Sequence, residues 1–264
     1  MNMQLEGKRA LVSGSTAGIG YAIAEGLATE GASVIVNGRT PQRVERALAS
    51  LIKGGVRGKL DGLPADLGTA AGAAAAIQKF PDVDILVNNL GIFEPKPFQE
   101  IPDEDWIKFF EVNVLSGVRL SRHYLPGMKQ RNWGRIVFIS SESALQIPAE
   151  MIHYGMTKTA QLAISRGLAE TTAGTGVTVN TVLPGPTASE GAMDFVGSLA
   201  ESQRKTQSEV EKEFFQSIRP TSLLRRFATP QEVAAMVTFV CSPLSSASNG
   251  AALRVDGGVV RSIV

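Results

Sequence analysis

The sequence RALVSGSTAGIG, residues 9–20, decides the fold of this chain. Its first half is a short apolar run that predicts a buried β-strand, and its second half carries Gly14, Gly18 and Gly20. A helical pattern rich in alanine follows at 19–30 and stops at a glycine. A strand, a glycine-rich turn and a helix in this order are typical of a unit that binds a dinucleotide.

Each of the three glycines has a physical reason to be there. Gly14 permits a sharp turn, Gly18 lets the backbone approach a pyrophosphate, and Gly20 lets the helix pack against the strand. The free N–H groups at the start of the helix then face the phosphates. The alternative is an ordinary strand-to-helix turn, and the strand before and helix after the loop argue against it.

The same alternation continues along the chain. Short β-branched runs predict strands at 33–37, 84–88, 135–140, 177–182 and 251–255, with a weaker one at 60–64. Helical patterns lie at 41–53, 69–80, 102–130, 151–173 and 230–241. We therefore predict one α/β domain over 1–264, a Rossmann-like, doubly wound parallel sheet of about seven strands. Residues 186–228 carry no strand pattern, and we expect them to form a helical substrate lid over the carboxyl edge of the sheet.

Composition excludes several other classes of protein. Lys and Arg number 26 and Asp and Glu 25, so the net charge of +1 predicts neither nucleic-acid nor membrane binding. Cys241 is the single cysteine and cannot form an internal disulfide, which favours a reducing compartment. The chain shows no secretory signal, no apolar run of about 18 residues and no metal-ligand spacing. We expect a cytoplasmic protein without a metal site.

The end of the second predicted strand indicates which nucleotide binds. Selection of NAD needs an acidic side chain there, and residues 36–40 read VNGRT, without an acid. The planar fork of Arg39 suits a 2′-phosphate instead. The alternative for Arg39 is a solvated charge at the start of the next helix. NADP(H) is therefore favoured over NAD(H).

Tyr154 and Lys158 are the strongest catalytic candidates. They are spaced i, i+4 within a predicted helix and so share one face. A phenol has a pKa near 10, and a nearby ammonium stabilises the phenolate and lowers that pKa. Tyr154 is thus a candidate acid for ketone reduction, or base for alcohol oxidation. A Tyr and Lys at this spacing also occur by chance on amphipathic helix surfaces.

With these motifs in order, the chain resembles the short-chain dehydrogenases/reductases along nearly its whole length. The loop at 14–20 matches the family's TGxxxGxG with Ser13 in place of Thr, and 88–91 matches NNAG with Leu90 in place of Ala. Ser141 lies 13 residues before Tyr154, the family's spacing. Asn113, the pair Pro184 and Gly185, and the DGG of 256–258 fall at further family positions.

The resemblance implies a role for each matched residue. Ser141 would bind the substrate oxygen, Tyr154 would transfer the proton, and Lys158 would bind the nicotinamide ribose and lower the pKa of Tyr154. Asn113 would hold a water in a proton relay, the alternative being a residue that only kinks its helix. Spacing favours Ser141 over Ser140. The implied cofactor contacts are Gly14, Ser15, Thr16, Gly18, Ile19, Gly20, Arg39, Asp66, Leu67, Asn89, Gly91, Tyr154, Lys158, Pro184, Gly185 and Thr187.

The expected function is the NADP(H)-dependent reduction of a ketone or other carbonyl to a secondary alcohol, or its reverse. Two alternatives stay open, a reductase of 3-oxoacyl thioesters on acyl carrier protein and a catalytically silent nucleotide sensor. Arg219, Arg225 and Arg226 keep a carrier-protein docking patch possible in principle. The expected partner is a small-molecule substrate with an apolar body, contacted from loops. Substrate candidates are Ile92, Phe93, Glu94, 142–147, Met151, Met193 and Phe195. The resemblance also implies a homotetramer or homodimer, and the apolar end at 259–264 fits burial against a neighbour.

Overall fold

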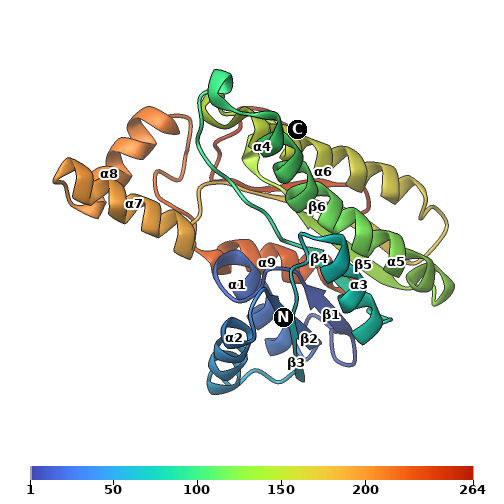
Figure 1. Ribbon diagram of the computed structural model, residues 1–264. Helices are drawn as coiled ribbons and strands as arrows, with labels where there is room; N and C mark the ends of the chain where they lie inside the picture. The colour runs from blue at the N-terminus through green and yellow to red at the C-terminus, as the bar shows by residue number, and fades with distance from the viewer. Residues whose placement is uncertain (1, 264) are drawn as a thin grey trace.

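The predicted parallel sheet is present at the centre of the molecule (Figure 1). The computed structural model describes residues 2–263, apart from the side chain of Phe195, and within them seven strands are ordered β3-β2-β1-β4-β5-β6-β7. Every neighbouring pair is parallel, and the weak candidate at 60–64 is one of the strands. Their bounds are β1 Arg9–Val12, β2 Ser33–Gly38, β3 Leu60–Pro64, β4 Ile85–Asn88, β5 Gly134–Ile139, β6 Val177–Pro184 and β7 Ala252–Val255.

Helices cover both faces of the sheet, as the uniformly apolar strands require. Along β1, Val12 packs into the core on one face and Leu11 into the core on the other. The first face is covered by α1 Gly18–Thr29, α2 Pro41–Lys53 and α9 Pro230–Cys241. The second is covered by α3 Ala70–Lys79, α5 Ser116–Gln130 and α6 Ile152–Glu170. The expected doubly wound Rossmann-like fold is thereby confirmed.

The strand order reverses at β1, and this reversal creates the crevice where a ligand can enter. Val12 of β1 pairs with Val36 of β2 on one side and with Val87 of β4 on the other. The connections after β1 and β4 leave toward opposite faces, so the sheet edge between them stays open. The glycine loop and residues 89–91 both lie at this edge.

The helix expected at 102–130 contains a wider turn. It runs as α4 Asp103–Phe110, a π-helical turn η2 Glu111–Leu115, and then α5. Asn113 lies in the middle of the turn, and its backbone oxygen accepts a hydrogen bond of 2.6 Å from Nε2 of Gln161 on α6. Such turns insert one residue into a helix and are frequent at functional sites. The remaining short helices are η1 Phe98–Glu100, η3 Glu142–Ala144, η4 Ala149–Met151 and η6 Pro243–Ser245.

The segment 186–228 is helical and projects from the sheet beside its carboxyl edge (Figure 1). It consists of α7 Glu190–Gln203, α8 Gln207–Glu213 and a π-helical turn η5 Phe214–Ile218. Phe215 lies between Phe214 and Phe227, with ring centroids 5.1 and 5.2 Å away, so the segment has an aromatic core of its own. A β-bridge between Thr187 and Ala228 joins its two ends.

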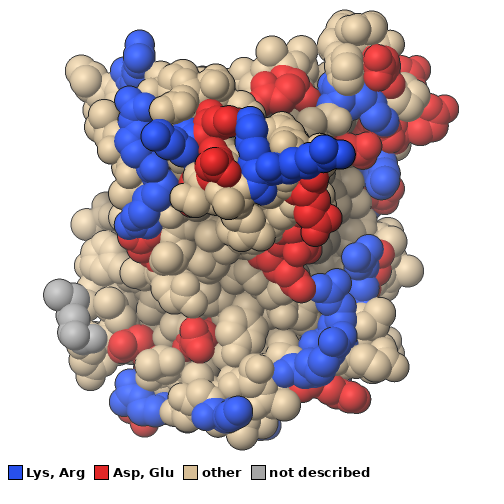
Figure 2. Space-filling model, turned by 90° about the vertical axis from the view of Figure 1, so that its left-hand side faces the viewer, with Lys and Arg blue, Asp and Glu red and all other residues tan. Residues whose placement is uncertain are grey.

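The surface carries charges of both signs. On the face shown in Figure 2, basic and acidic side chains are interspersed. Across residues 2–263, none of the helices combines the length and the apolar character that a membrane crossing demands. At the carboxyl end, Val259 and Val260 are buried within their own chain, whereas Ile263 is 98% exposed. The expected burial against a neighbour is therefore not needed for Val259 and Val260, and Val264 lies outside the described residues.

We predict that Gly20→Ala destabilises the protein. A Cβ at Gly20 would lie 2.3 Å from the carbonyl oxygen of Gly14 and 2.5 Å from Nδ2 of Asn89. Relieving such an overlap costs about 1–3 kcal/mol. The control is Gly167→Ala on α6, where a Cβ meets nothing within 4 Å and should stabilise the helix by up to about 1 kcal/mol. Urea unfolding checks both, and equal stabilities for the two variants would contradict the packing argument.

Candidate active site

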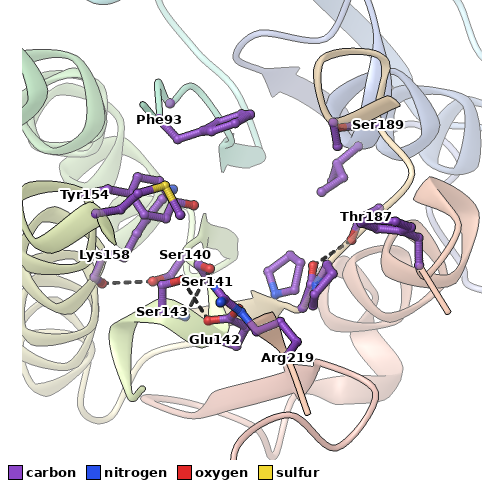
Figure 3. A pocket seen from close by; sticks show the side chains of 18 of the residues that line it. Phe93, Ser140, Ser141, Glu142, Ser143, Tyr154, Lys158, Thr187, Ser189 and Arg219 are labelled. Atoms are coloured by element: carbon purple, nitrogen blue, oxygen red, sulfur yellow. Dashed lines mark hydrogen bonds and ion pairs between the residues drawn. The ribbon is translucent and has the colours of Figure 1, made fainter. Parts of the chain in front are cut away.

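A cavity of about 480 Å³ opens at the carboxyl edge of the sheet, beneath the segment 186–228 (Figure 3). Figure 3 shows Tyr154 and Lys158 on one wall and Thr187 and Ser189 on the opposite wall. Its lining includes the following predicted site residues: Ile19, Asn89, Gly91, Ser141, Tyr154, Lys158, Pro184, Gly185 and Thr187. Residues from five different parts of the chain therefore meet in one concave site, the usual geometry of a ligand site.

Tyr154 and Lys158 lie on α6 as their spacing predicted. The Nζ atom of Lys158 lies 5.5 Å from the centroid of the Tyr154 ring. The same Nζ donates a hydrogen bond of 3.0 Å to the backbone oxygen of Ile139 at the end of β5. It also lies 3.4 Å from Oε1 of Gln161. Lys158 is thus held behind the tyrosine by strand and helix together.

Burial shifts the pKa values of the two residues in opposite directions. Desolvation raises the pKa of Tyr154 to about 12, against the lowering effect of its hydrogen bond with Ser141. Desolvation lowers the pKa of Lys158 to about 8. The resemblance implies that Lys158 lowers the pKa of Tyr154, but burial is the larger effect and the net shift is upward. Tyr154 is consequently a protonated phenol at neutral pH.

The adjacent serines have different surroundings. The hydroxyl of Ser140 donates a hydrogen bond of 2.8 Å to the backbone oxygen of Lys158, which ties β5 to α6. The hydroxyl oxygen of Ser141 accepts a hydrogen bond of 3.1 Å from the backbone N–H of Ser143 and contacts Tyr154. Ser141 therefore presents its hydroxyl beside the phenol, whereas Ser140 has a structural bond.

Asn113 contributes its side chain to a buried network. Its Oδ1 accepts from the backbone N–H of Ile92 at 2.7 Å, and its Nδ2 donates to Thr157 Oγ1 at 3.0 Å. Gln161 connects this network to the lysine, because its amide donates to the Asn113 backbone oxygen and its Oε1 faces Lys158. Sequence reasoning missed Gln161, although its i+3 spacing from Lys158 was a signal.

The glycine loop has the backbone that its sequence predicted. Gly14 and Gly18 adopt φ values of +60° and +56°, which a residue with a Cβ adopts only with strain. The N-cap residue of α1, Ala17, makes no side-chain cap, so the first N–H groups of the helix are left for a ligand. Ser189 lies across the loop, where a Cβ on Gly18 would come within 3.2 Å of it.

The residues around β2 separate into structural and exposed groups. The side chain of Asn37 accepts from Gly14 N at 3.0 Å and donates to the backbone oxygens of Leu63 and Ala65, so it is fully engaged. Arg39 follows the strand and is exposed. A Cβ on Gly38 would lie 2.5 Å from Thr16, which places this strand end directly against the glycine loop.

Several predicted cofactor contacts are not part of the wall of the main cavity: Gly14, Ser15, Thr16, Gly18, Gly20, Arg39, Asp66 and Leu67. Asp66 lines a separate hollow of about 300 Å³ that it shares with residues of α4 and η2, and its Oδ1 accepts from Gly68 N at 3.0 Å. Leu67 is buried in the core beneath it. Gly185, on the opposite wall of the main cavity, packs directly against the backbone of Asp256. A Cβ on Gly185 would lie only 2.6 Å from the backbone oxygen of Asp256.

A pairing of charged groups that the sequence did not predict lies in the wall of the cavity. Arg219 Nε donates to Glu142 Oε1 at 3.0 Å, and Arg219 Nη1 donates to Glu150 Oε1 at 3.2 Å. Arg226 instead pairs with Glu232 at 2.7 Å outside the cavity. Arg219 is therefore not part of the basic patch that the sequence left open, whereas Arg225 and Arg226 are exposed and line another hollow with Lys212.

The substrate candidates divide in the same way. The cavity wall contains Phe93, Glu142, Ser143 and Met151, and the ring of Phe93 lies 6.3 Å from that of Tyr154. Ile92, Glu94, 144–147 and Met193 are not part of this wall. The side chain of Phe195 lies outside the described part of the structure.

Comparisons with known proteins agree with this arrangement. A family model described as enoyl-(acyl carrier protein) reductase, from the short-chain dehydrogenases/reductases, matches residues 14–260. The chain belongs to the short-chain dehydrogenase/reductase family. Its relatives at full length are oxidoreductases, and this chain is an oxidoreductase of the same family.

Three relatives illustrate the range of this family. The chain is 52% identical over 263 residues to the oxidoreductase YvaG of Bacillus subtilis, with 100% of both chains covered. It is 34% identical over 260 residues to D-beta-hydroxybutyrate dehydrogenase of Cupriavidus necator, covering 97% of this chain and 99% of the relative. The structure of L-sorbose reductase from Gluconobacter frateurii, complexed with NADPH and L-sorbose, superposes with a TM-score of 0.93 at 31% identity, covering 100% of both chains.

His153, which directly precedes Tyr154, is fully buried. Its ring packs against Phe109 and Trp106 with centroids 4.1 and 5.9 Å away. Among residues 2–263, neither ring nitrogen has a hydrogen-bond partner. Desolvation lowers the pKa of His153 and outweighs the attraction of Asp105 and Glu94, so the folded protein holds the neutral imidazole.

We predict that His153 makes the fold sensitive to acid. The unfolded chain binds a proton near pH 6.5, whereas the folded chain resists it, so stability is lost as pH falls from 6.5 toward the lower folded pKa. In His153→Leu this component disappears, and the free energy of unfolding should fall less between pH 7 and pH 5. Urea unfolding at both pH values checks this, and identical pH slopes for the two proteins would contradict it.

Proposed function

We propose that this chain catalyses the NADP(H)-dependent reduction of a ketone to a secondary alcohol, or the reverse oxidation. One observation carries the proposal: Ser141 and Tyr154 direct their hydroxyls into one cavity, with Lys158 held behind the phenol. These two hydroxyls can donate to the same carbonyl oxygen. A donor pair of this kind stabilises negative charge as it develops on that oxygen.

The cavity also fits a nicotinamide dinucleotide. Gly14 and Gly18 form a turn without side chains, and a Cβ on Gly91 would lie 3.4 Å from Lys158 Nζ and 3.6 Å from Asn113 Oδ1. The residues proposed to hold the cofactor are those of the glycine loop, Asn89, Gly91, Lys158, 184–187 and, for the adenosine end, Arg39, Asp66 and Leu67. Bound there, the cofactor would supply or accept the hydride.

Tyr154 is suited to the role of general acid. Its pKa of about 12 keeps the phenol protonated at pH 7, ready to donate to the alkoxide oxygen of the product. Lys158, with a pKa near 8, is mostly an ammonium at that pH and stabilises the tyrosinate left behind. Both protonation states favour the reductive direction.

We propose a positioning role for Gln161 and Asn113. Their contacts fix the side of the Lys158 ammonium that faces away from the cavity. An amide donates from one atom and accepts at another, so Gln161 orients the lysine without itself passing a proton. The relay expected from Asn113 would then reach the lysine through a water beside this amide.

One structural relative supports this reading. L-sorbose reductase, complexed with NADPH, is a carbonyl reductase by name and shares the fold at full length. A silent sensor is disfavoured because Ser141, Tyr154 and Lys158 are all present in one cavity. For a carrier-protein reductase, Arg219 contributes nothing to a basic docking patch because it is buried against Glu142, and the exposed Arg225 and Arg226 remain as its support.

We also propose that the protein is a cytoplasmic homotetramer or homodimer. The free, buried Cys241 supports a reducing compartment. Ile107 and Phe110 on α4 are 66% and 39% exposed, which supports an interface along the long helix.

The proposed reaction is tested by following oxidation of NADPH and of NADH against a panel of ketones. Tyr154→Phe should reduce kcat at least about 1,000-fold, because the acid is lost while the ring remains. The dissociation constant for NADPH, measured by fluorescence, should stay within about threefold. Full activity in this variant would exclude Tyr154 as the proton donor.

Arg39→Ala tests the choice of nucleotide. Loss of a charge-assisted bond to the 2′-phosphate should raise KM for NADPH about 10- to 100-fold and leave KM for NADH nearly unchanged. Arg46→Ala is the matched control, since Arg46 is an exposed arginine on the neighbouring helix α2. Equal changes for both nucleotides would remove Arg39 as the phosphate-binding residue.

A further inference from the structure

A buried ion pair lies in the wall of the cavity that holds Tyr154. Arg219 is 8% exposed and Glu142 is 4% exposed, and the two bond at 3.0 Å. Ser143 donates from its hydroxyl to the other Glu142 oxygen at 2.7 Å. Around them the wall is apolar, with Phe93, Pro95, Met151, Phe214, Ile218 and Phe227. A polar cluster is thus set into an otherwise apolar surface (Figure 3).

Fold stability does not account for this cluster. Taking two charges out of water carries a desolvation penalty, and replacing a buried ion pair by apolar side chains is often neutral or stabilising. Phe214 and Ile218 show that this segment can supply apolar side chains to the same wall. The position of the charges next to Ser141 and Tyr154 points instead to recognition of a substrate.

The hydrogen-bonding capacity of the cluster is only partly used. Arg219 donates from Nε to Glu142 and from Nη1 to Glu150 and to the backbone oxygen of Ile218. Among residues 2–263, its Nη2 has no hydrogen-bond partner, and neither has Oε2 of Glu150. A donor and an acceptor are therefore available together, and a hydroxyl group is the ligand that both donates and accepts.

The charge of the cluster selects against anions. Two carboxylates, Glu142 and Glu150, surround the one guanidinium of Arg219. A substrate carboxylate at this end of the cavity would approach two like charges, of which Glu142 is buried and therefore poorly screened by water. A neutral hydroxyl meets no such repulsion.

We propose that Arg219, Glu142 and Glu150 form a hydroxyl-binding subsite, and that the substrate is an uncharged polyhydroxylated ketone. This inference rests on the proposed carbonyl reduction and specifies its substrate class. Glu142 directly follows Ser141, and Arg219 ends the helical part of the segment 186–228. The subsite therefore forms only where this segment meets the loop after β5, which links recognition of the hydroxyls to placement of the carbonyl.

The test compares ketones of equal chain length with NADPH. The hydroxylated one is 1,3,4-trihydroxybutan-2-one, the plain one is butan-2-one, and the anionic one is 3-oxobutanoate. We expect kcat/KM for the trihydroxy ketone to exceed the other two values at least about 100-fold, since a site built for hydroxyls rejects analogues that lack them.

Two variants then test the named residues. Arg219→Met should reduce the preference for the trihydroxy ketone over butan-2-one at least about 10-fold, and Glu150→Gln should reduce it less, because its amide still accepts a hydrogen bond. Arg226→Met is the control, an arginine of the same segment that pairs with Glu232 outside the cavity. It should keep the wild-type preference.

Each outcome decides the inference. If kcat/KM for the trihydroxy ketone and for butan-2-one fell equally in the Arg219 and Glu150 variants, the cluster would have only a structural role, and this result would overturn the subsite. A wild-type preference for butan-2-one or 3-oxobutanoate would overturn the substrate class and leave the proposed reduction intact. Turnover of no ketone with either nucleotide would instead refute the proposed function itself. Because Glu150 is half exposed, its variant remains informative if Arg219→Met does not fold.

Discussion

The site depends on one close approach between backbones. Where the strand order reverses, helix α1 crosses the end of β1 so tightly that Gly20 leaves no room for a Cβ above the carbonyl of Gly14. Asn89, from the end of β4, donates to the Ser13 and Gly14 oxygens at 3.0 and 3.1 Å, and Asn37, from the end of β2, accepts from Gly14 N. Three strand ends are thereby fixed to one turn. The crevice keeps its shape because its floor consists of backbone, which has no alternative rotamers.

The chemistry of the site follows from burial. Desolvation favours the neutral forms of both Tyr154 and Lys158, so the phenol is a poor base but a proton donor across the physiological range. Bonds to strand β5 and to Gln161 hold the lysine in place despite the cost of burying it. In the proposed reaction these donors surround the position of one oxygen before a substrate arrives, and such preorganisation lowers the reorganisation required during reaction. The charged cluster around Arg219 extends the same arrangement to the far side of the cavity.

Local patterns in the sequence were sufficient for much of this. The glycine loop, the strands and the pairing of Tyr154 with Lys158 are each encoded within a few residues, because strand and helix periodicity determine which side chains share a face. Even the weak strand β3 was correctly placed. The π-helical turn at Asn113 was not expected. The backbone oxygen of Asn113 in this turn accepts a hydrogen bond from Gln161, which lies 48 residues away, so no local pattern indicates the contact. The upward net shift of the Tyr154 pKa was also not expected, since neighbouring charge is visible in the sequence and burial is not.

The sequence by itself therefore determined the family, the doubly wound sheet, the nucleotide loop and the catalytic candidates. Only the tertiary structure decided which side chains line the cavity. Arg219 and Glu142 are 77 residues apart, and nothing in the local pattern around either residue distinguishes a buried pair from two solvated charges. From the sequence, Arg219 was a candidate for a basic patch with Arg225 and Arg226. In the structure its side chain is buried and pairs with Glu142. The physical reason is that desolvation and pairing of charges depend on which distant segments pack together, and that is a property of the folded chain.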